Sequence, residues 1–170
     1  RRRYPVLLFE RVAGSDIPIV ANAVASRRAL AFALDTTERG LAGEYARRIK
    51  DHVKPVVVAD PPFRARVQRG ADVDLGSLPI PEYFPGDAGR YLTAGMLVAR
   101  DPDTGVETEG YHRFQVKGRT KMGVSLHSRR RMYELHRRAE AKGESLPAAI
   151  TLGIHPLHYM GSMVFAYPPN

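Results

Sequence analysis

The sequence predicts a mixed α/β (α+β) protein in two parts, an α/β region over residues 1–77 and a β-rich region over 90–170. In the first part, short apolar runs alternate with stretches whose apolar residues recur at the spacing of an amphipathic helix. In the second part, candidate strands flank a strong turn sequence. Residues 78–89 join the parts and contain three prolines and two glycines, so we expect an irregular connector there.

Strands are predicted at three places in the first part. The apolar runs over residues 5–9 and 17–20 have the length of short buried strands. The β-branched run over 56–58 favours a third strand. Together with the helices between them, these strands suggest an α/β layer.

Two helices are predicted between the second and third of these strands. The first runs from Ser26 to Leu34, with apolar residues at helical spacing. The second is expected to be capped by residues 35–37, because Asp and Thr side chains accept hydrogen bonds from free amides at a helix start. Its apolar stripe consists of Leu41, Tyr45 and Ile49.

The second part is predicted to begin with a hairpin. Residues 91–100 and 107–117 are candidate strands, and residues 101–105 between them read Asp-Pro-Asp-Thr-Gly. Proline is preset for a turn and glycine adopts positive φ freely, so the chain is expected to reverse here. The remaining predicted elements are strands at 121–126 and 147–153, a helix from Ser128 to Lys142 ended by Gly143, and a short helix or loop over 155–165.

Charge and cysteine content limit the function classes. The net charge is +8, from 26 Lys and Arg against 18 Asp and Glu, which suits an anionic cofactor, an anionic substrate, an acidic partner chain or nucleic acid. Nucleic acid is the least favoured, because the basic residues form scattered pairs with one internal triplet at 129–131. The chain has no cysteine, which excludes disulfides, Cys-ligated zinc and thiol nucleophiles. No apolar run approaches the roughly 20 residues that span a bilayer, and we expect a cytoplasmic protein.

Four segments resemble the UbiD family of decarboxylases, which use prenylated FMN. A single turn sequence would carry no weight, but four segments in the family's order cover almost the whole chain. The similarity is to the N-terminal half of family members. The segments are residues 5–34, 72–105, 110–119 and 140–156.

The resemblance implies a fold and a chemistry. It implies an N-terminal α/β region followed by a flavin-reductase-like split β-barrel, of which residues 90–170 would supply the first half. It also implies reversible decarboxylation of an aromatic or α,β-unsaturated acid, with prenylated FMN as the electron sink. The chain looks too short to complete that site as a single chain. A second protein chain is therefore expected to supply the C-terminal half in a hetero-oligomer.

The same resemblance implies a set of site residues. Arg113 aligns with the family arginine that contacts the substrate carboxylate and the cofactor. A guanidinium binds a carboxylate through two parallel hydrogen bonds. Judged from the residues alone, Arg113 also suits a surface position at a strand edge, and Gly110 suits a bulge. The implied cofactor-binding set is Thr108, Gly110, Tyr111, His112, Arg113, Ser125, Leu126, Arg130 and Arg131.

The sequence departs from the family at the metal. Family members hold the cofactor phosphate through a divalent metal such as Mn and a monovalent cation such as K. Their metal-binding Asn corresponds to Thr108, a weak ligand, and their His to Arg131, which stays protonated and cannot ligate a cation. The third family ligand, a Glu, would lie beyond residue 170. We hypothesise that Arg130 and Arg131 grip the phosphate directly. The alternatives are an exposed basic helix start and a degenerate site that binds no flavin.

No general acid or base is identified. Glu107 and Glu109 share one face of their predicted strand, opposite Gly110 and His112, and neither is assigned a catalytic role. The six histidines include no pair with a third ligand at zinc spacing. The leading function is a subunit or fragment of a UbiD-like carboxy-lyase. The alternatives are a non-catalytic, UbiD-derived assembly module and a basic nucleic-acid-binding protein.

Overall fold

The computed structural model describes residues 4–51, 53–126 and 130–164. The chain divides into two units, Arg1–Leu78 and Pro79–Asn170, and each is described by itself. The class is mixed α/β, as predicted, and both sheets are antiparallel.

The first unit begins with a small hairpin. Strand β1 (Leu7–Phe9) pairs with β2 (Ile19–Ala21), and Leu8 lies opposite Val20. Both strands fall within or beside the two apolar runs predicted to form strands. Most of their side chains are exposed, so this hairpin has little core of its own.

Helices α1 (Arg27–Ala33) and α2 (Leu41–Lys50) follow. Ser26 caps α1 as predicted, because its hydroxyl accepts a hydrogen bond from the Ala29 amide at 3.1 Å. The cap predicted for α2 is wrong, since that helix starts after Gly40 with no side-chain cap. Thr37 instead accepts from the Gly40 amide at 3.1 Å, and so closes the turn before the helix.

The third predicted strand, at residues 56–58, is also wrong. Residues 53–58 have no regular secondary structure, and Val57 is 95% exposed. β-Branched residues favour a strand through packing against sheet neighbours, and no strand in the described residues pairs with this run. The unit ends in short 3-10 helices at Pro62–Ala65, Gly70–Asp72 and Leu75–Ser77.

The second unit is built on a four-stranded sheet with the order β5-β4-β3-β6. The predicted hairpin is confirmed, because β3 and β4 pair with Arg100 opposite Glu107. The turn closes through the Gly105 amide, which donates to the Asp101 carbonyl at 2.8 Å, and Gly105 has a φ of 73°. The strands are β3 (Tyr91–Arg100), β4 (Glu107–Val116), β5 (Met122–Val124) and β6 (Ala148–Thr151).

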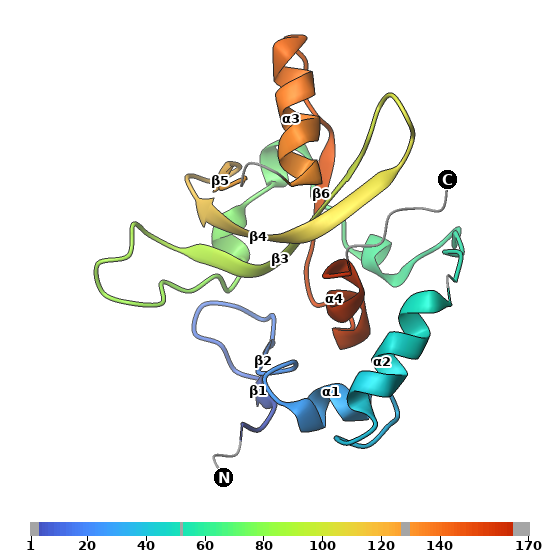
Figure 1. Cartoon of the computed structure of the whole chain (residues 1–170). Helices are drawn as coiled ribbons and strands as arrows, with labels where there is room; N and C mark the ends of the chain where they lie inside the picture. The colour runs from blue at the N-terminus through green and yellow to red at the C-terminus, as the bar shows by residue number, and fades with distance from the viewer. Residues whose placement is uncertain (1–3, 52, 127–129, 165–170) are drawn as a thin grey trace. The chain divides into compact units, whose positions relative to one another are not determined.

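Helices α3 (Arg131–Ala141) and α4 (Pro156–Ser162) lie on opposite sides of this sheet (Figure 1). Gly143 ends α3 with a φ of 70°, as predicted, whereas the predicted cap Ser128 lies outside the described residues. His155 begins α4, since its Nδ1 accepts from the Leu157 amide at 3.2 Å. None of the helices in the described ranges is long and apolar enough to cross a membrane.

The core of the second unit lies between the sheet and α3. Phe114 on β4 is 2% exposed and forms a cluster with Leu97 and Ala99 of β3 and Met132 and Leu135 of α3. A glycine is required beside it, because a Cβ at Gly95 would lie 2.7 Å from the Phe114 ring. This packing fixes which face of β4 is directed toward α3.

Candidate functional site

Strand β4 carries five of the predicted site residues and divides them between two faces. Successive side chains of a strand point to opposite faces, and Phe114 points into the core beneath α3. The residues on the α3 face are Thr108, Gly110 and His112, and those on the other face are Tyr111 and Arg113. The predicted site residues therefore do not form one cluster on a single face.

One edge of β4 is open along Glu107–Arg113. Within the described residues, β5 pairs with β4 only at Phe114–Val116, whereas β3 follows the opposite edge along the strand. An open edge presents backbone N–H and C=O groups that another strand or a ligand can bind. The predicted site residues of β4 thus lie on the part of the strand that pairs with β3 on one edge and with no described strand on the other.

The hydrogen bonds at the end of β4 show which backbone groups face this edge. The Val116 amide donates to Arg90 on the β3 side, and the Lys117 amide donates to Lys121 on the β5 side. Backbone groups alternate sides along a strand, so those of Tyr111 and Arg113 face the open edge. A flat ligand lying along the edge would meet them directly.

Arg113 lies at one end of the open edge and is exposed. Its guanidinium has no hydrogen bond or ion pair with any residue in the described ranges. Two other arginines of this unit lie in ion pairs, since Arg100 contacts Glu107 at 2.6 Å and Arg138 contacts Asp101 at 2.7 Å. The positive charge of Arg113 is therefore available to an anion.

Helix α4 covers the Arg113 face of β4 through two side-chain pairs. Tyr111 stacks on Tyr159 with ring centroids 4.8 Å apart, and Glu109 Oε2 lies 2.8 Å from His158 Nε2. Burial, with the adjacent Tyr159, raises the pKa of Tyr111 to about 12, so its hydroxyl stays neutral at physiological pH. Sequence reasoning missed His158 and Tyr159, because nothing in the local pattern shows which strand a short helix will cover.

The other face of β4 borders a half-open hollow of about 280 Å³. It brings together Thr108 and Arg131, two residues predicted to replace the family's metal ligands. Arg131 is the first residue of α3. The residues lining the hollow are Asp101, Thr104, Val106, Thr108, Arg131, Glu134, Leu135 and Arg138.

The remaining predicted site residues lie where β5 leads into α3. The Ser125 carbonyl is 3.4 Å from His112 Nδ1, and Leu126 packs against the core cluster. Arg130 precedes α3 and makes no side-chain cap to it. Ser125, Leu126 and Arg130 do not line the hollow.

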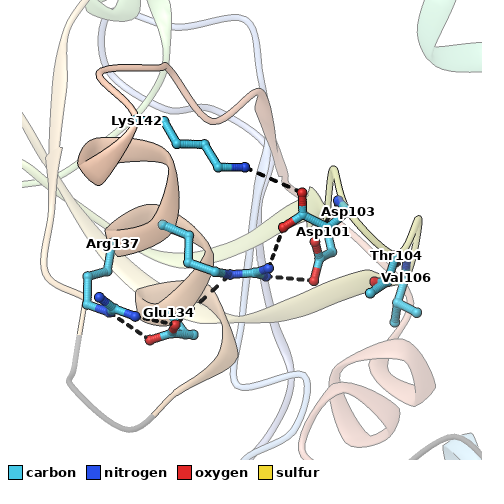
Figure 2. Close-up of polar contacts among 8 residues, drawn as sticks. Asp101, Asp103, Thr104, Val106, Glu134, Arg137 and Lys142 are labelled. Atoms are coloured by element: carbon cyan, nitrogen blue, oxygen red, sulfur yellow. Dashed lines mark hydrogen bonds and ion pairs between the residues drawn. The ribbon is translucent and has the colours of Figure 1, made fainter.

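The carboxylates of the hollow are held by arginines of α3 (Figure 2). Asp101 Oδ2 lies 2.7 Å from Arg138 Nη2, and Glu134 Oε1 lies 2.7 Å from Arg137 Nη2. Hydrogen bonds from Arg138 and from the Asp103 amide hold the pKa of Asp101 below its usual value. Figure 2 also shows Lys142 directed toward Asp103, at 3.4 Å. The hairpin turn and α3 are thus joined by ion pairs.

A divalent metal does not fit this hollow. The described ranges contain no group of three His, Asp, Glu or Cys side chains that could hold a metal ion. Thr108 offers a neutral hydroxyl, which is a weak ligand, and Arg131 offers no lone pair. Both carboxylates already lie in ion pairs, so a cation would have to displace arginines to reach them.

We expect Asp101→Asn to destabilise the protein at neutral pH, with an effect that fades in acid. Because folding lowers the pKa of Asp101, its contribution is fully present above the unfolded pKa of about 3.9. It is lost as the pH falls through the folded value. Urea unfolding of both proteins from pH 7 to pH 3 should show the stability difference shrinking below about pH 4. A difference that stays constant over this range would contradict the assignment.

Two family models match this chain. Residues 54–170 match the family model described as the 3-octaprenyl-4-hydroxybenzoate carboxy-lyase Rift-related domain (UbiD). Residues 1–49 match the N-terminal domain described for the same carboxy-lyase. The two models together cover nearly the whole chain.

Curated relatives and a solved structure agree with these matches. A phenolic acid decarboxylase from a Streptomyces species is 38% identical over 96% of this chain and 37% of the relative. Anhydromevalonate phosphate decarboxylase from Methanothermobacter thermautotrophicus is 31% identical over 91% of this chain and 36% of the relative. The UbiD-class enzyme HmfF from Pelotomaculum thermopropionicum, solved with prFMN, is 34% identical with a TM-score of 0.84, over 95% of this chain and 38% of HmfF. The chain thus spans little more than a third of the length of these proteins.

Proposed function

Because this chain belongs to the UbiD family of carboxy-lyases, we propose that it forms part of a decarboxylase that uses prenylated FMN. The substrate class is an aromatic or α,β-unsaturated carboxylic acid. The observation that carries the proposal is the exposed guanidinium of Arg113, which has no partner within the described ranges and lies at the end of an open strand edge. The HmfF structure with prFMN and the decarboxylases among the relatives support it.

Arg113 binds the carboxylate of the acid in this proposal. A guanidinium keeps its charge at any working pH and matches a carboxylate with two parallel hydrogen bonds. Such a grip orients the acid and holds it against the cofactor until the C–C bond breaks. The neighbouring Glu109 is paired with His158 at 2.8 Å, which leaves Arg113 without a competing carboxylate from its own strand.

The open edge of β4 fits a flat, anionic flavin. Backbone N–H and C=O groups of Tyr111 and Arg113 face the edge and can pair with the polar rim of the ring system. At Gly110 a Cβ would have only His112 Nε2 within 4 Å, at 3.6 Å, so backbone and ligand can approach closely. Prenylated FMN, when bound, would supply the electron sink that decarboxylation needs.

A further polypeptide segment completes the site in this proposal. In this proposal the four-stranded sheet of the second unit belongs to a flavin-reductase-like split β-barrel, and further strands extend it. Two features of the separate units support this. The sheet of the second unit has an open edge, and the first unit exposes large apolar side chains such as Phe32 and Val57. We propose that a second chain supplies this segment, as the two-component name of the vanillic acid decarboxylase from Sedimentibacter hydroxybenzoicus suggests for a structural neighbour.

Native mass spectrometry of the assembly purified from its own cells tests the proposal. We expect one complex that contains this chain, a second polypeptide and the mass of a prenylated flavin. A complex that contains a second polypeptide but never a flavin would contradict the enzyme and favour a non-catalytic assembly module. Retention of nucleic acid in place of flavin would favour the nucleic-acid-binding alternative.

A further inference from the structure

A pair of stacked tyrosines lies beside Arg113 on the face of β4 that helix α4 covers. Tyr111 of β4 and Tyr159 of α4 have ring centroids 4.8 Å apart, and their planes are inclined by 15°. Tyr111 and Arg113 are two residues apart on one strand, so both side chains leave the same face, with about 6.6 Å between their backbone positions. The aromatic pair therefore begins one side-chain step from the guanidinium.

The Tyr159 hydroxyl holds this pair at the level of Arg113. It donates a hydrogen bond of 3.0 Å to the Ala94 carbonyl of β3. The register between β3 and β4 shifts between Leu92 and Gly95, and Ala94 lies within this stretch. The same stretch of β3 runs alongside Arg113 of β4. Tyr159 thus contacts both strands next to Arg113, which fixes the orientation of its ring.

The aromatic pair is uncharged and partly open to a ligand. Burial raises the pKa of Tyr111 to about 12 and also raises the pKa of Tyr159, so both phenols stay neutral at physiological pH. The neighbouring carboxylate of Glu109 lies 2.8 Å from His158 Nε2. Tyr111 keeps 38% of its surface exposed. An anion bound at Arg113 would therefore meet a neutral aromatic surface on one side.

We propose that Tyr111 and Tyr159 form a specificity-determining wall, which favours acids whose carboxylate is attached directly to a flat aromatic ring. The inference rests on the proposed function and narrows its substrate class. With the carboxylate on Arg113, the ring of such an acid reaches the exposed part of Tyr111, one side-chain step away. Aromatic rings gain energy from offset-stacked or edge-to-face contact with an aromatic neighbour, and a saturated chain or ring lacks this gain.

A matched pair of acids separates the carboxylate from the ring in a binding test. Benzoate and cyclohexanecarboxylate both carry an ionised carboxylate directly on a six-membered ring at neutral pH, and only benzoate is flat and aromatic. Isothermal titration calorimetry with the native assembly gives the dissociation constant of each. We expect benzoate to bind about threefold or more tightly than cyclohexanecarboxylate, the usual range for one added aromatic contact.

The variant that tests the aromatic wall is Tyr111→Leu. We expect it to lower the preference for benzoate to less than about twofold, because the ring contact is lost, whereas Tyr111→Phe keeps the ring and should keep the preference. Arg113→Gln should weaken both acids alike, by about tenfold or more. Tyr4→Leu serves as the matched control, because it removes a tyrosine that is 53% exposed in the first unit. It should change neither constant.

The outcomes separate this inference from the proposed function. If neither acid binds the wild-type assembly, the carboxylate site fails, and with it the proposed function. If both acids bind equally, or if Tyr111→Leu keeps the preference for benzoate, the aromatic wall is overturned while the carboxylate site stands. If Tyr111→Leu binds neither acid, α4 no longer packs on β4. Tyr111→Met then decides through the same ratio, because its thioether can still pack on Tyr159.

Discussion

In the proposed decarboxylase, replacing Arg113 by glutamine is expected to lower kcat/KM by about a hundredfold or more. The variant keeps a polar side chain but loses the charge and one prong of the grip on the substrate carboxylate. Hydrogen bonds to charged groups contribute about 1.5–3 kcal/mol each. The loss of one bond, together with the charge that strengthens the other, corresponds to about two orders of magnitude or more. Steady-state kinetics on an aromatic acid such as a hydroxybenzoate measures the effect.

Two further variants make the Arg113 experiment decisive. Arg113→Lys keeps the charge as a point rather than a fork, so we expect a smaller loss than for glutamine. Arg64→Gln removes the same charge from an exposed position of the first unit and should leave kcat/KM within about twofold of the wild type. Equal rates for Arg113→Gln and wild type would show that the carboxylate is bound elsewhere.

The largest expected effect on stability comes from Phe114→Ala. The Phe114 side chain is 2% exposed and contacts the cluster that joins the sheet to α3. Removing a buried phenylalanine costs the transfer energy of the ring and leaves a cavity, about 3–5 kcal/mol in total. Urea unfolding at neutral pH should show the midpoint of the transition moving to lower urea. The loss is a large fraction of a typical folding free energy of about 5–15 kcal/mol.

The matched control for Phe114 is Phe32→Ala in helix α1. The chemical change is the same, but Phe32 is 88% exposed, so its loss should alter the unfolding free energy by less than about 0.5 kcal/mol. Similar effects for the two variants would contradict the packing described for β4 and α3. They would also remove the basis for assigning the two faces of that strand.

The elements that the sequence predicts correctly are those with local causes. The hairpin of β3 and β4 follows from the Asp-Pro-Asp-Thr-Gly turn, where Gly105 takes positive φ, and α1 starts at the capping Ser26. The strand predicted at Val56–Val58 is wrong, because β-branched residues need a neighbouring strand that the described residues do not provide. The β propensity of a segment does not show whether another strand is available to pair with it.

The candidate site could be predicted only as a set of residues, without their arrangement. The resemblance indicated Thr108, Arg113 and Arg131, but strand alternation separates Arg113 from the hollow that the other two line. The open edge of β4 depends on how short β5 is, and three residues of pairing cannot be foreseen from composition. The ion pairs between Asp101 and Arg138 join residues far apart in the sequence, which no local pattern reveals.

Hydrogen exchange at the open edge of β4 tests the central claim most directly. The native assembly, freed of any bound flavin, is compared with and without added FMN, and exchange is followed amide by amide. Flavin lying along the edge should slow exchange at Tyr111 and Arg113, while the Val116 amide, already bonded to Arg90, should stay unchanged. Bound FMN that leaves Tyr111 and Arg113 exchanging as fast as before would contradict the account.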